Sequence, residues 1–350
     1  MSHRLSRRTW LLGLLAAGAT AHAGEAGNVV ARAALIGARS TSRLQLALAC
    51  AGERIVSVGE RGIVLLSDDQ GRRWRQARCP VSVTLTAVTF VDAQQGWAVG
   101  HSGVVLHTDD GGETWRRQLE GVAAAQAMLD GARSSGVPPL PEAERLVADG
   151  PDKPFLDVHF SDARHGLVVG AYGLILRTAD GGRSWQSAAD RVHNPGARHL
   201  YAIETVGSRQ YLVGEQGLLF AGPVDGVLQR LNAPYDGTFF GLRAFGDGAL
   251  VLFGLRGHAY LSTDAGRQWR ALALGASHSV TAAAALRGGG FVLVDEGGRV
   301  LKGGAAGDAL QAVPVAPAFP FCDVVQATDG RLVLAGARGT LRLEAEMGAS

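Results

Sequence analysis

The chain has 350 residues, of which 47% are hydrophobic and 19% charged, so it is long and apolar enough to fill a sizeable core. Its 49 glycines against 12 prolines indicate many tight turns rather than a low-complexity segment. The formal net charge is only +2, which argues against a nucleic-acid-binding protein.

The first predicted element is an export signal at residues 1–23, with a basic start and a small-x-small cleavage site, Ala21-His22-Ala23. Its apolar run, Trp10 to Ala19, is too short to span a bilayer. The stretch Ser6-Arg7-Arg8-Thr9-Trp10-Leu11 resembles a twin-arginine (Tat) signal, and an ordinary secretory signal with paired arginines is the alternative. Both predict a soluble periplasmic protein, with residues 24–350 as a single domain.

Seven turns with the pattern Gly-x-x-Gly, one of them degenerate, recur between apolar stretches. Their first positions are separated by 41, 70, 44, 40, 41 and 41 residues, and they start at Gly59, Gly100, Gly170, Gly214, Gly254, Asp295 and Gly336. A period near forty suits a four-stranded propeller blade. The sequence therefore predicts an all-β fold, a seven-bladed β-propeller of four-stranded blades. In blade two the strands would start at Leu85, Gly96, Val104 and Trp115.

A second repeated signal is an eight-residue turn with an aspartate, a glycine and a closing tryptophan. Its four copies, here called the Asp turns, are residues 67–74, 108–115, 178–185 and 262–269. The aspartate accepts backbone N–H groups of its own turn, and the tryptophan packs where the next strand begins. We expect structural roles for Asp69, Trp74, Asp110, Trp115, Asp180, Trp185, Asp264 and Trp269.

Two departures from the repeat carry their own predictions. The 70-residue step indicates an insertion at residues 119–153, with helical and loop sequence, between blades two and three and overhanging one face of the propeller. Blade seven ends after its third strand, so residues 28–36 are expected to supply the missing outer strand and close the ring.

Propeller geometry places the Asp turns on one face and both the Gly-x-x-Gly turns and the blade-to-blade links on the other, here called the link face. Loops on a rigid scaffold are the usual place for binding residues. The candidate binding residues are the arginines and aromatics of this face: Arg61, His101, Tyr172, Tyr201, Arg256 and Arg338. The links also carry Phe239, Phe240 and Phe321, for which plugging of the channel is the alternative role.

No metal, cofactor or redox site is predicted. The ten histidines are dispersed, and no glycine-rich pattern follows a strand and opens a helix. The cysteines Cys50, Cys79 and Cys322 are interpreted as small buried residues, with one disulfide and one free thiol as the alternative.

The Asp turns resemble the BNR or Asp-box repeat. Together with the export signal and turns such as Gly100 to Gly103, they make the chain similar to the photosystem II stability/assembly factor family, from residue 33 to residue 343. The resemblance implies a monomeric, non-enzymatic scaffold that binds a membrane-protein client. It also suggests an arginine-rich docking surface at Arg61, Arg256 and Arg338, whereas Ser102, Tyr172, Gln216 and Gly297 depart from that pattern.

Two alternatives to the scaffold stay open. One is a sialidase-like or other carbohydrate-active propeller, with acids from Glu60, Glu215 and Glu296. Against it, the sequence lacks an early Arg-Ile-Pro signature, and the Asp-turn carboxylates lie on the other face. The second alternative is a structural ring without a single partner.

Overall fold

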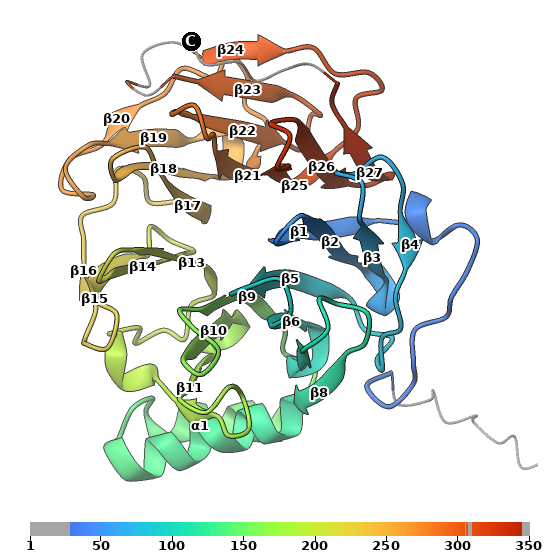
Figure 1. The fold of residues 1–350 in the computed structure, drawn as a ribbon. Helices are drawn as coiled ribbons and strands as arrows, with labels where there is room; N and C mark the ends of the chain where they lie inside the picture. The colour runs from blue at the N-terminus through green and yellow to red at the C-terminus, as the bar shows by residue number, and fades with distance from the viewer. Residues whose placement is uncertain (1–28, 305, 307–309, 345–350) are drawn as a thin grey trace, which may run out of the picture.

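The strands form a closed ring of antiparallel sheets, each radiating from a central channel (Figure 1). The computed structural model describes residues 29–304, 306 and 310–344. Within these residues seven sheets occur, six of four strands and one of three. In each sheet the strands follow chain order from the channel outward. The predicted all-β fold, a seven-bladed propeller of four-stranded blades, is confirmed.

The first four blades have the following strands. Blade one contains β1 (Gln45–Ala51), β2 (Arg54–Gly59), β3 (Val64–Ser67) and β4 (Arg75–Gln76). Blade two contains β5 (Leu85–Phe90), β6 (Gly96–Gly100), β7 (Val105–Thr108) and β8 (Arg116–Leu119). Blade three contains β9 (Phe155–Phe160), β10 (Gly166–Gly170), β11 (Ile175–Thr178) and β12 (Gln186–Ser187). Blade four contains β13 (Leu200–Val206), β14 (Arg209–Gly214), β15 (Leu219–Pro223) and β16 (Gln229–Arg230).

The remaining blades repeat this order. Blade five contains β17 (Phe239–Phe245), β18 (Ala249–Gly254), β19 (Ala259–Ser262) and β20 (Arg270–Ala271). Blade six contains β21 (Val280–Ala285), β22 (Phe291–Asp295), β23 (Val300–Gly303) and β24 (Leu310–Val313). Blade seven contains β25 (Phe321–Gln326), β26 (Leu332–Gly336) and β27 (Gly339–Arg342). Hydrophobic clusters lie between successive blades, so the sheets pack face to face around the ring.

The first glycine of the repeated turn is required by a close approach of two backbone segments. In blade five a Cβ on Gly254 would lie 2.2 Å from the carbonyl oxygen of Thr238, just before β17. The next residue, Leu255, donates its N–H to that same oxygen at 3.0 Å. The corresponding bond recurs in all seven blades, at distances of 2.9–3.2 Å. Each turn is therefore tied to the start of its own innermost strand, which holds the link face rigid.

The prediction that residues 28–36 supply the outer strand of blade seven is wrong. Residue 28 lies outside the described residues, and residues 29–36 form no strand. Their backbone bonds instead reach the link between blades one and two: Ala34 donates to the Cys79 carbonyl at 3.0 Å, and Val29 accepts the Ser82 N–H at 2.8 Å. A 3-10 turn, η1 (Ser40–Ser42), then leads past β27 into β1. The ring closes because β1 packs against β25 without a shared sheet.

Two α-helices, α1 (Gly121–Ser135) and α2 (Leu140–Ala148), lie between β8 and β9 among the described residues. The helix α1 packs against β11, β12 and α2 at the outer rim (Figure 1). Its Ala124, Ala125 and Met128 join the hydrophobic core of blade three. The helices thus extend the outer edge of this blade rather than overhanging a face. No helix in the described part is long and apolar enough to cross a membrane.

Candidate functional site

The Asp turns use their polar groups within the turn itself. Asp180 accepts the Ser184 N–H at 3.0 Å, the Ser184 hydroxyl at 2.6 Å and the Thr178 hydroxyl at 2.8 Å. The Ser184 hydroxyl, first among these bonds, lowers the pKa of Asp180 to about 2. Asp69, Asp110 and Asp264 accept the equivalent N–H bonds at 2.8–3.0 Å. These carboxylates are therefore committed to turn geometry.

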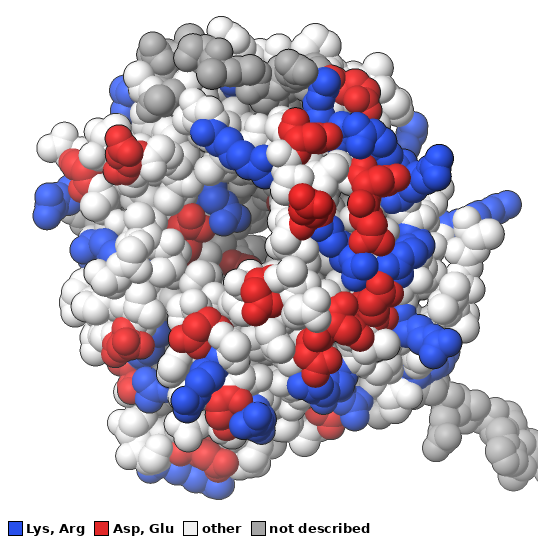
Figure 2. Space-filling model, viewed as in Figure 1, with Lys and Arg blue, Asp and Glu red and all other residues white. Residues whose placement is uncertain are grey.

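Charged side chains around the Asp turns pair locally. Arg54 Nε lies 2.5 Å from Asp68 Oδ1, and Arg54 Nη2 lies 3.0 Å from Glu113 Oε1. Arg75 joins both acids. The view in Figure 2 likewise shows blue and red side chains interspersed over the face that it displays. Each charged side chain of this network has a neighbour of opposite charge. The network therefore does not form a positively or negatively charged surface patch.

The link face presents side chains from strained backbone positions. The third residue of the turn has a left-handed φ in five blades, with values of 53–58°: Arg61, Ser102, Tyr172, Gln216 and Arg256. This conformation costs a non-glycine residue about 1–2 kcal/mol. The large side chains at Arg61, Tyr172 and Arg256 are exposed, although Tyr172 also contacts the His199 ring and Lys153. Such strain at an exposed position favours a binding role.

The structure brings some predicted site residues together and keeps others apart. Arg61, His101, Tyr172 and Arg256 are exposed, each on the turn of a different blade. Arg338 is exposed as well, in a tighter turn where Gly336 pairs directly with Gly339. Tyr172 and Tyr201, by contrast, belong to one row of contacting rings.

That row, here called the aromatic track, consists of Tyr172, His199, Tyr201 and Phe240 across blades three to five. Successive ring centroids are 5.0, 6.4 and 5.5 Å apart, and successive rings are tilted by 59°, 50° and 66°. Lys153 closes one end, with its Nζ 5.5 Å from the centre of the Tyr172 ring. Tyr172 is 51% exposed, and the other three rings are half-buried.

Two members of the track stand on β-bulges. The pairing of innermost and second strands shifts register at Leu200/Ala202 in blade four and at Phe239/Gly241 in blade five. A bulge re-aims the extra side chain, here Tyr201 and Phe240. At the same bulge, Thr86 of blade two and Thr281 of blade six hydrogen bond to a carbonyl of the next blade at 2.8 Å. The same bulge recurs in all seven blades, and only in blades four and five does it carry an aromatic side chain.

The link phenylalanines do not plug the channel together. Phe239 and Phe321 are 0% and 1% exposed and pack into the cores between blades. Only Phe240 is half-buried, as part of the track. Burial separates the three because the residue before the bulge points into the sheet interface, whereas the bulged residue points away from it.

Four charged residues of the innermost strands face one another across the channel. Arg243 lies 2.9 Å from Glu204, and its charge also interacts with Asp157 and Asp323 of blades three and seven. Burial raises the pKa of Asp157 to about 7 and that of Asp323 to about 6. Each of these two carboxylates accepts a backbone N–H of the next blade, so they serve as links between blades.

The acids proposed for a hydrolase are engaged separately. Glu296 accepts the Ser279 N–H at 2.8 Å, which lowers its pKa. Glu215 lies 3.7 Å from His199 Nδ1, and Glu60 belongs to the turn of blade one. The structure therefore places the three acids on three different blades. In the described part of the chain, no group of three or more metal-ligating side chains is arranged to hold an ion.

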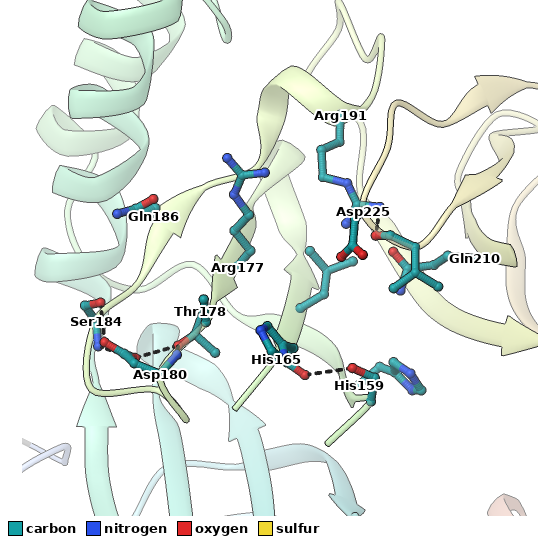
Figure 3. A pocket seen from close by; sticks show the side chains of 15 residues that line it. His159, His165, Arg177, Thr178, Asp180, Ser184, Gln186, Arg191, Gln210 and Asp225 are labelled. Atoms are coloured by element: carbon teal, nitrogen blue, oxygen red, sulfur yellow. Dashed lines mark hydrogen bonds between the residues drawn. The ribbon is translucent and has the colours of Figure 1, made fainter. Parts of the chain in front are cut away.

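A pocket of about 420 Å³ lies between blades three and four on the side of the Asp turns (Figure 3). Several of its polar side chains stabilise the fold. Arg191 donates to the carbonyl oxygens of Val224 at 2.6 Å and Gly226 at 3.0 Å, and so holds the outer hairpin of blade four. Thr178, Asp180 and Ser184 are those of the Asp turn in blade three.

The cysteines follow the predicted burial only in part. Cys79 is buried and Cys322 half-buried, but Cys50 is exposed on β1, so the interpretation of three buried residues is wrong for Cys50. All three are free thiols. Burial raises the pKa of both Cys79 and Cys322 to about 11, which keeps them protonated and unreactive at neutral pH.

Sequence reasoning missed the channel carboxylates and Lys153. A signal for the carboxylates exists, because Phe155 and Phe321 each begin the pattern Phe-x-Asp-Val. Lys153 has no such signal, since it follows the inserted helices and only the fold brings it to Tyr172.

Comparisons with solved structures agree with the fold. A structure described as YCF48 bound to D1 peptide has a TM-score of 0.65 and 18% identity, and the match covers 89% of this chain and 95% of that one. The WD40 β-propeller domain of Doa1 has a TM-score of 0.62 and 14% identity, over 88% and 96% of the chains. At such low identity these likenesses show the fold alone.

Two curated relatives match part of the sequence. The photosystem II assembly lipoprotein Ycf48 of Synechococcus sp. (strain CC9902) is 28% identical over 128 residues, 36% of this chain and 38% of that protein. The chloroplastic photosystem II stability/assembly factor HCF136 of Oryza sativa subsp. japonica is 27% identical over 151 residues, 40% of this chain and 36% of that protein. The match thus spans little more than a third of either relative.

The match to a family as a whole is longer. The sequence model of the family described as photosynthesis system II assembly factor YCF48 matches residues 66–130 and 145–308, and the interruption falls within the inserted helices. These two segments cover more than half of the chain and include five of the seven repeated turns and all four Asp turns. The resemblance predicted from the turns is therefore confirmed, and the chain belongs to the family of the photosynthesis system II assembly factor YCF48.

Proposed function

We propose that this protein is a non-enzymatic scaffold or assembly factor that holds an exposed segment of a membrane protein on its link face. The observation that carries the proposal is the contrast between the two faces. The aspartates of the Asp turns accept hydrogen bonds from within their own turns. The link face, by contrast, exposes Arg61, Tyr172 and Arg256 from strained turns. A rigid ring that displays arginine and aromatic side chains suits protein binding.

Family membership supports the same proposal. The relatives are named as assembly factors, and one solved relative is described as bound to a D1 peptide. For this chain we infer a client of the same general kind, a membrane-protein segment, without assigning the client's identity. The protein would act as a monomer, because one ring carries the complete link face.

The test is crosslinking in cells of the tagged protein, followed by identification of the partners purified from solubilised membranes. The informative variant reverses three exposed charges of the link face: Arg61→Glu, Arg256→Glu and Arg338→Glu. We expect one dominant membrane-protein partner, which this triple variant loses.

The matched control reverses three exposed arginines beside the Asp turns: Arg73→Glu, Arg183→Glu and Arg267→Glu. It changes the net charge by the same amount on the opposite face. The control should retain the partner. A partner that is lost equally in both variants, or no partner above background, contradicts the proposal and makes a glycan and glycosidase screen the next experiment.

We also propose that the protein works in the periplasm after export through the Tat route. The support is the paired Arg7 and Arg8 before an apolar run. Replacing both arginines by lysine should leave the full-length precursor in the cytoplasmic fraction. Continued export of this variant would assign the chain to the ordinary secretory route instead.

A further inference from the structure

We propose that the aromatic track binds an extended peptide segment of the client, with apolar side chains at alternate positions. This inference rests on the proposed scaffold function and adds where on the link face the client lies and which chemistry is recognised. The residues that carry it are Tyr172, His199, Tyr201 and Phe240.

The spacing of the rings suits an extended chain. Successive centroids are 5.0–6.4 Å apart. In an extended segment, side chains on the same side are two residues and about 6.6 Å apart. Apolar side chains at every second position would therefore meet successive gaps between rings, while the intervening side chains point to solvent.

The tilt of the rings argues against a sugar as the occupant. A sugar ring stacks on a flat aromatic face, and a chain of sugars needs several faces that are nearly coplanar. Neighbouring rings of the track are tilted by 59°, 50° and 66°, so that edges and faces alternate. Tilted rings form wedge-shaped gaps, which accept single side chains and not a flat platform.

The width and the border of the track favour one peptide strand. The track is a single row of successive ring contacts, whereas a helix with its side chains is about 10–12 Å wide. Polar groups from the turn of blade four border it: Arg198 Nε donates to Gln216 Oε1 at 2.6 Å, and Glu215 lies beside His199. An extended segment leaves its backbone N–H and C=O groups unpaired, and these polar side chains offer them partners.

The bulges show that ring exposure is built into the fold. The equivalent bulged residues in blades two and six are threonines, and their hydroxyls bond to the next blade at 2.8 Å. The bulged residues of blades one, three and seven are Leu46, Leu156 and Cys322. Only blades four and five place aromatic residues there, Tyr201 and Phe240, with the two rings in contact. Tyr172 extends the row outward from a left-handed φ of 56°. The two bulges and the left-handed turn residue thus place three of the four rings in the track.

The direct test is selection of 12-residue peptides from a random displayed library on the purified protein. We expect enriched peptides with apolar residues at alternate positions. Binding of the best enriched peptide, measured by fluorescence polarisation, should weaken at least about tenfold in Tyr201→Ser and in Phe240→Ser, as for hot-spot residues. The exposed Tyr172→Ser variant, which disturbs no core, should weaken binding as well. Thermal unfolding of each variant checks that the ring remains folded.

A second test locates the client in cells. Benzoylphenylalanine placed at Tyr172 or Phe240 should photocrosslink to the same membrane protein that co-purifies with the tagged chain. The matched control is Val227, which is 56% exposed in the outer hairpin of the neighbouring blade four, on the other face. Crosslinks from Tyr172 and Phe240 without one from Val227 support the proposal.

The failures of the two proposals are distinguishable. A client that is lost in the arginine reversal but retained in Tyr201→Ser and Phe240→Ser overturns the track and leaves the scaffold function standing. Enriched peptides with apolar residues three or four apart overturn the extended conformation and indicate a helix. If no client is found in cells and no peptide is enriched, both the proposed scaffold function and the proposed role of the aromatic track are overturned.

Discussion

The carboxylate of Asp323 in the last blade accepts the backbone N–H of Leu48 in the first blade at 2.7 Å, across 275 residues of sequence. Its other oxygen accepts the Val324 N–H at 2.8 Å. Asp157 bonds Ile203 and Val158 in the same way, at 2.8 Å each, between blades three and four. No sheet in the described residues contains strands of two blades, so each of these carboxylates links its own blade to an N–H group of the next blade.

The seam between blades seven and one should therefore be sensitive to Asp323. In Asp323→Asn the amide nitrogen replaces one acceptor oxygen and faces an N–H group. The unpaired group should cost about 1–3 kcal/mol of the free energy of unfolding. Urea unfolding measures this loss. Asp157→Asn should show a similar loss, and the exposed Asp247→Asn little or none. An unchanged midpoint in Asp323→Asn would mean that blade packing alone closes the ring.

The pH dependence of stability should reveal the same two carboxylates. Burial raises the pKa of Asp157 to about 7 and that of Asp323 to about 6 in the folded protein, against about 3.9 in the unfolded chain. The folded state thus binds more protons between about pH 4 and 7, so the contribution of these groups to stability falls as the pH rises through that window.

The measurement is the difference in unfolding free energy between the wild-type protein and the double variant Asp157→Asn, Asp323→Asn from pH 4 to pH 8. The difference is needed because His107, whose pKa burial lowers to about 4, acts in the opposite direction. We expect the advantage of the wild-type protein to shrink between about pH 4 and 7 and then to level off. An advantage that grows with pH would contradict the raised pKa values.

The aspartate of each Asp turn should contribute individually to stability. Asp180→Ala removes the acceptor of the Ser184 N–H, the Ser184 hydroxyl and the Thr178 hydroxyl. The expected loss is about 1–2 kcal/mol, as for other short side chains that cap backbone N–H groups. Because the pKa of Asp180 is about 2 in the folded protein and about 3.9 in the unfolded chain, its contribution should be complete above about pH 5 and fall progressively as the pH drops towards 1. A difference in unfolding free energy between the wild-type protein and Asp180→Ala that does not fall between pH 5 and pH 2 would contradict the lowered pKa.

Much of the fold could be predicted because every blade repeats one physical requirement. A carbonyl oxygen approaches the first position of the repeated turn closely, as at Gly254, and this favours glycine there. The spacing of these glycines along the sequence therefore gives the number of blades. Blade six departs from this pattern: Asp295 takes the position of the glycine, and its carboxylate accepts the N–H and Nε–H of Arg299 at 2.9 and 2.7 Å. No comparable sequence motif indicates how the ring closes.

The site was less predictable for two physical reasons. Residues 29–36 are apolar and have the length of a strand, but their backbone bonds go to Cys79 and Ser82 in the link between blades one and two. The candidate residues Tyr172 and Tyr201 could be predicted as exposed aromatics of the link face. That both rings contact His199 depends on how neighbouring blades are placed, which the sequence does not reveal. Alignment of the bulge positions across blades was the available signal for Tyr201 and Phe240.

The strained turns give a last prediction, which separates stability from binding. Arg256 has a left-handed φ of 58°, so Arg256→Gly should relieve strain and raise the free energy of unfolding by up to about 1 kcal/mol. The same variant removes a guanidinium from the link face and should capture less client in the crosslinking experiment. Ser102→Gly, with a φ of 57° and a small side chain, is the matched control.

The control should gain similar stability and retain the client, because it changes the backbone but no large side chain. Thermal unfolding and client capture are measured on the same preparations. Client loss in both variants would show that turn conformation, rather than the arginine, determines binding. Lower stability of Arg256→Gly would show that its side chain stabilises the fold, and Arg256 would then be a structural residue. If Arg256→Gly is more stable but captures less client, the strained conformation of Arg256 is retained for binding at a cost in stability.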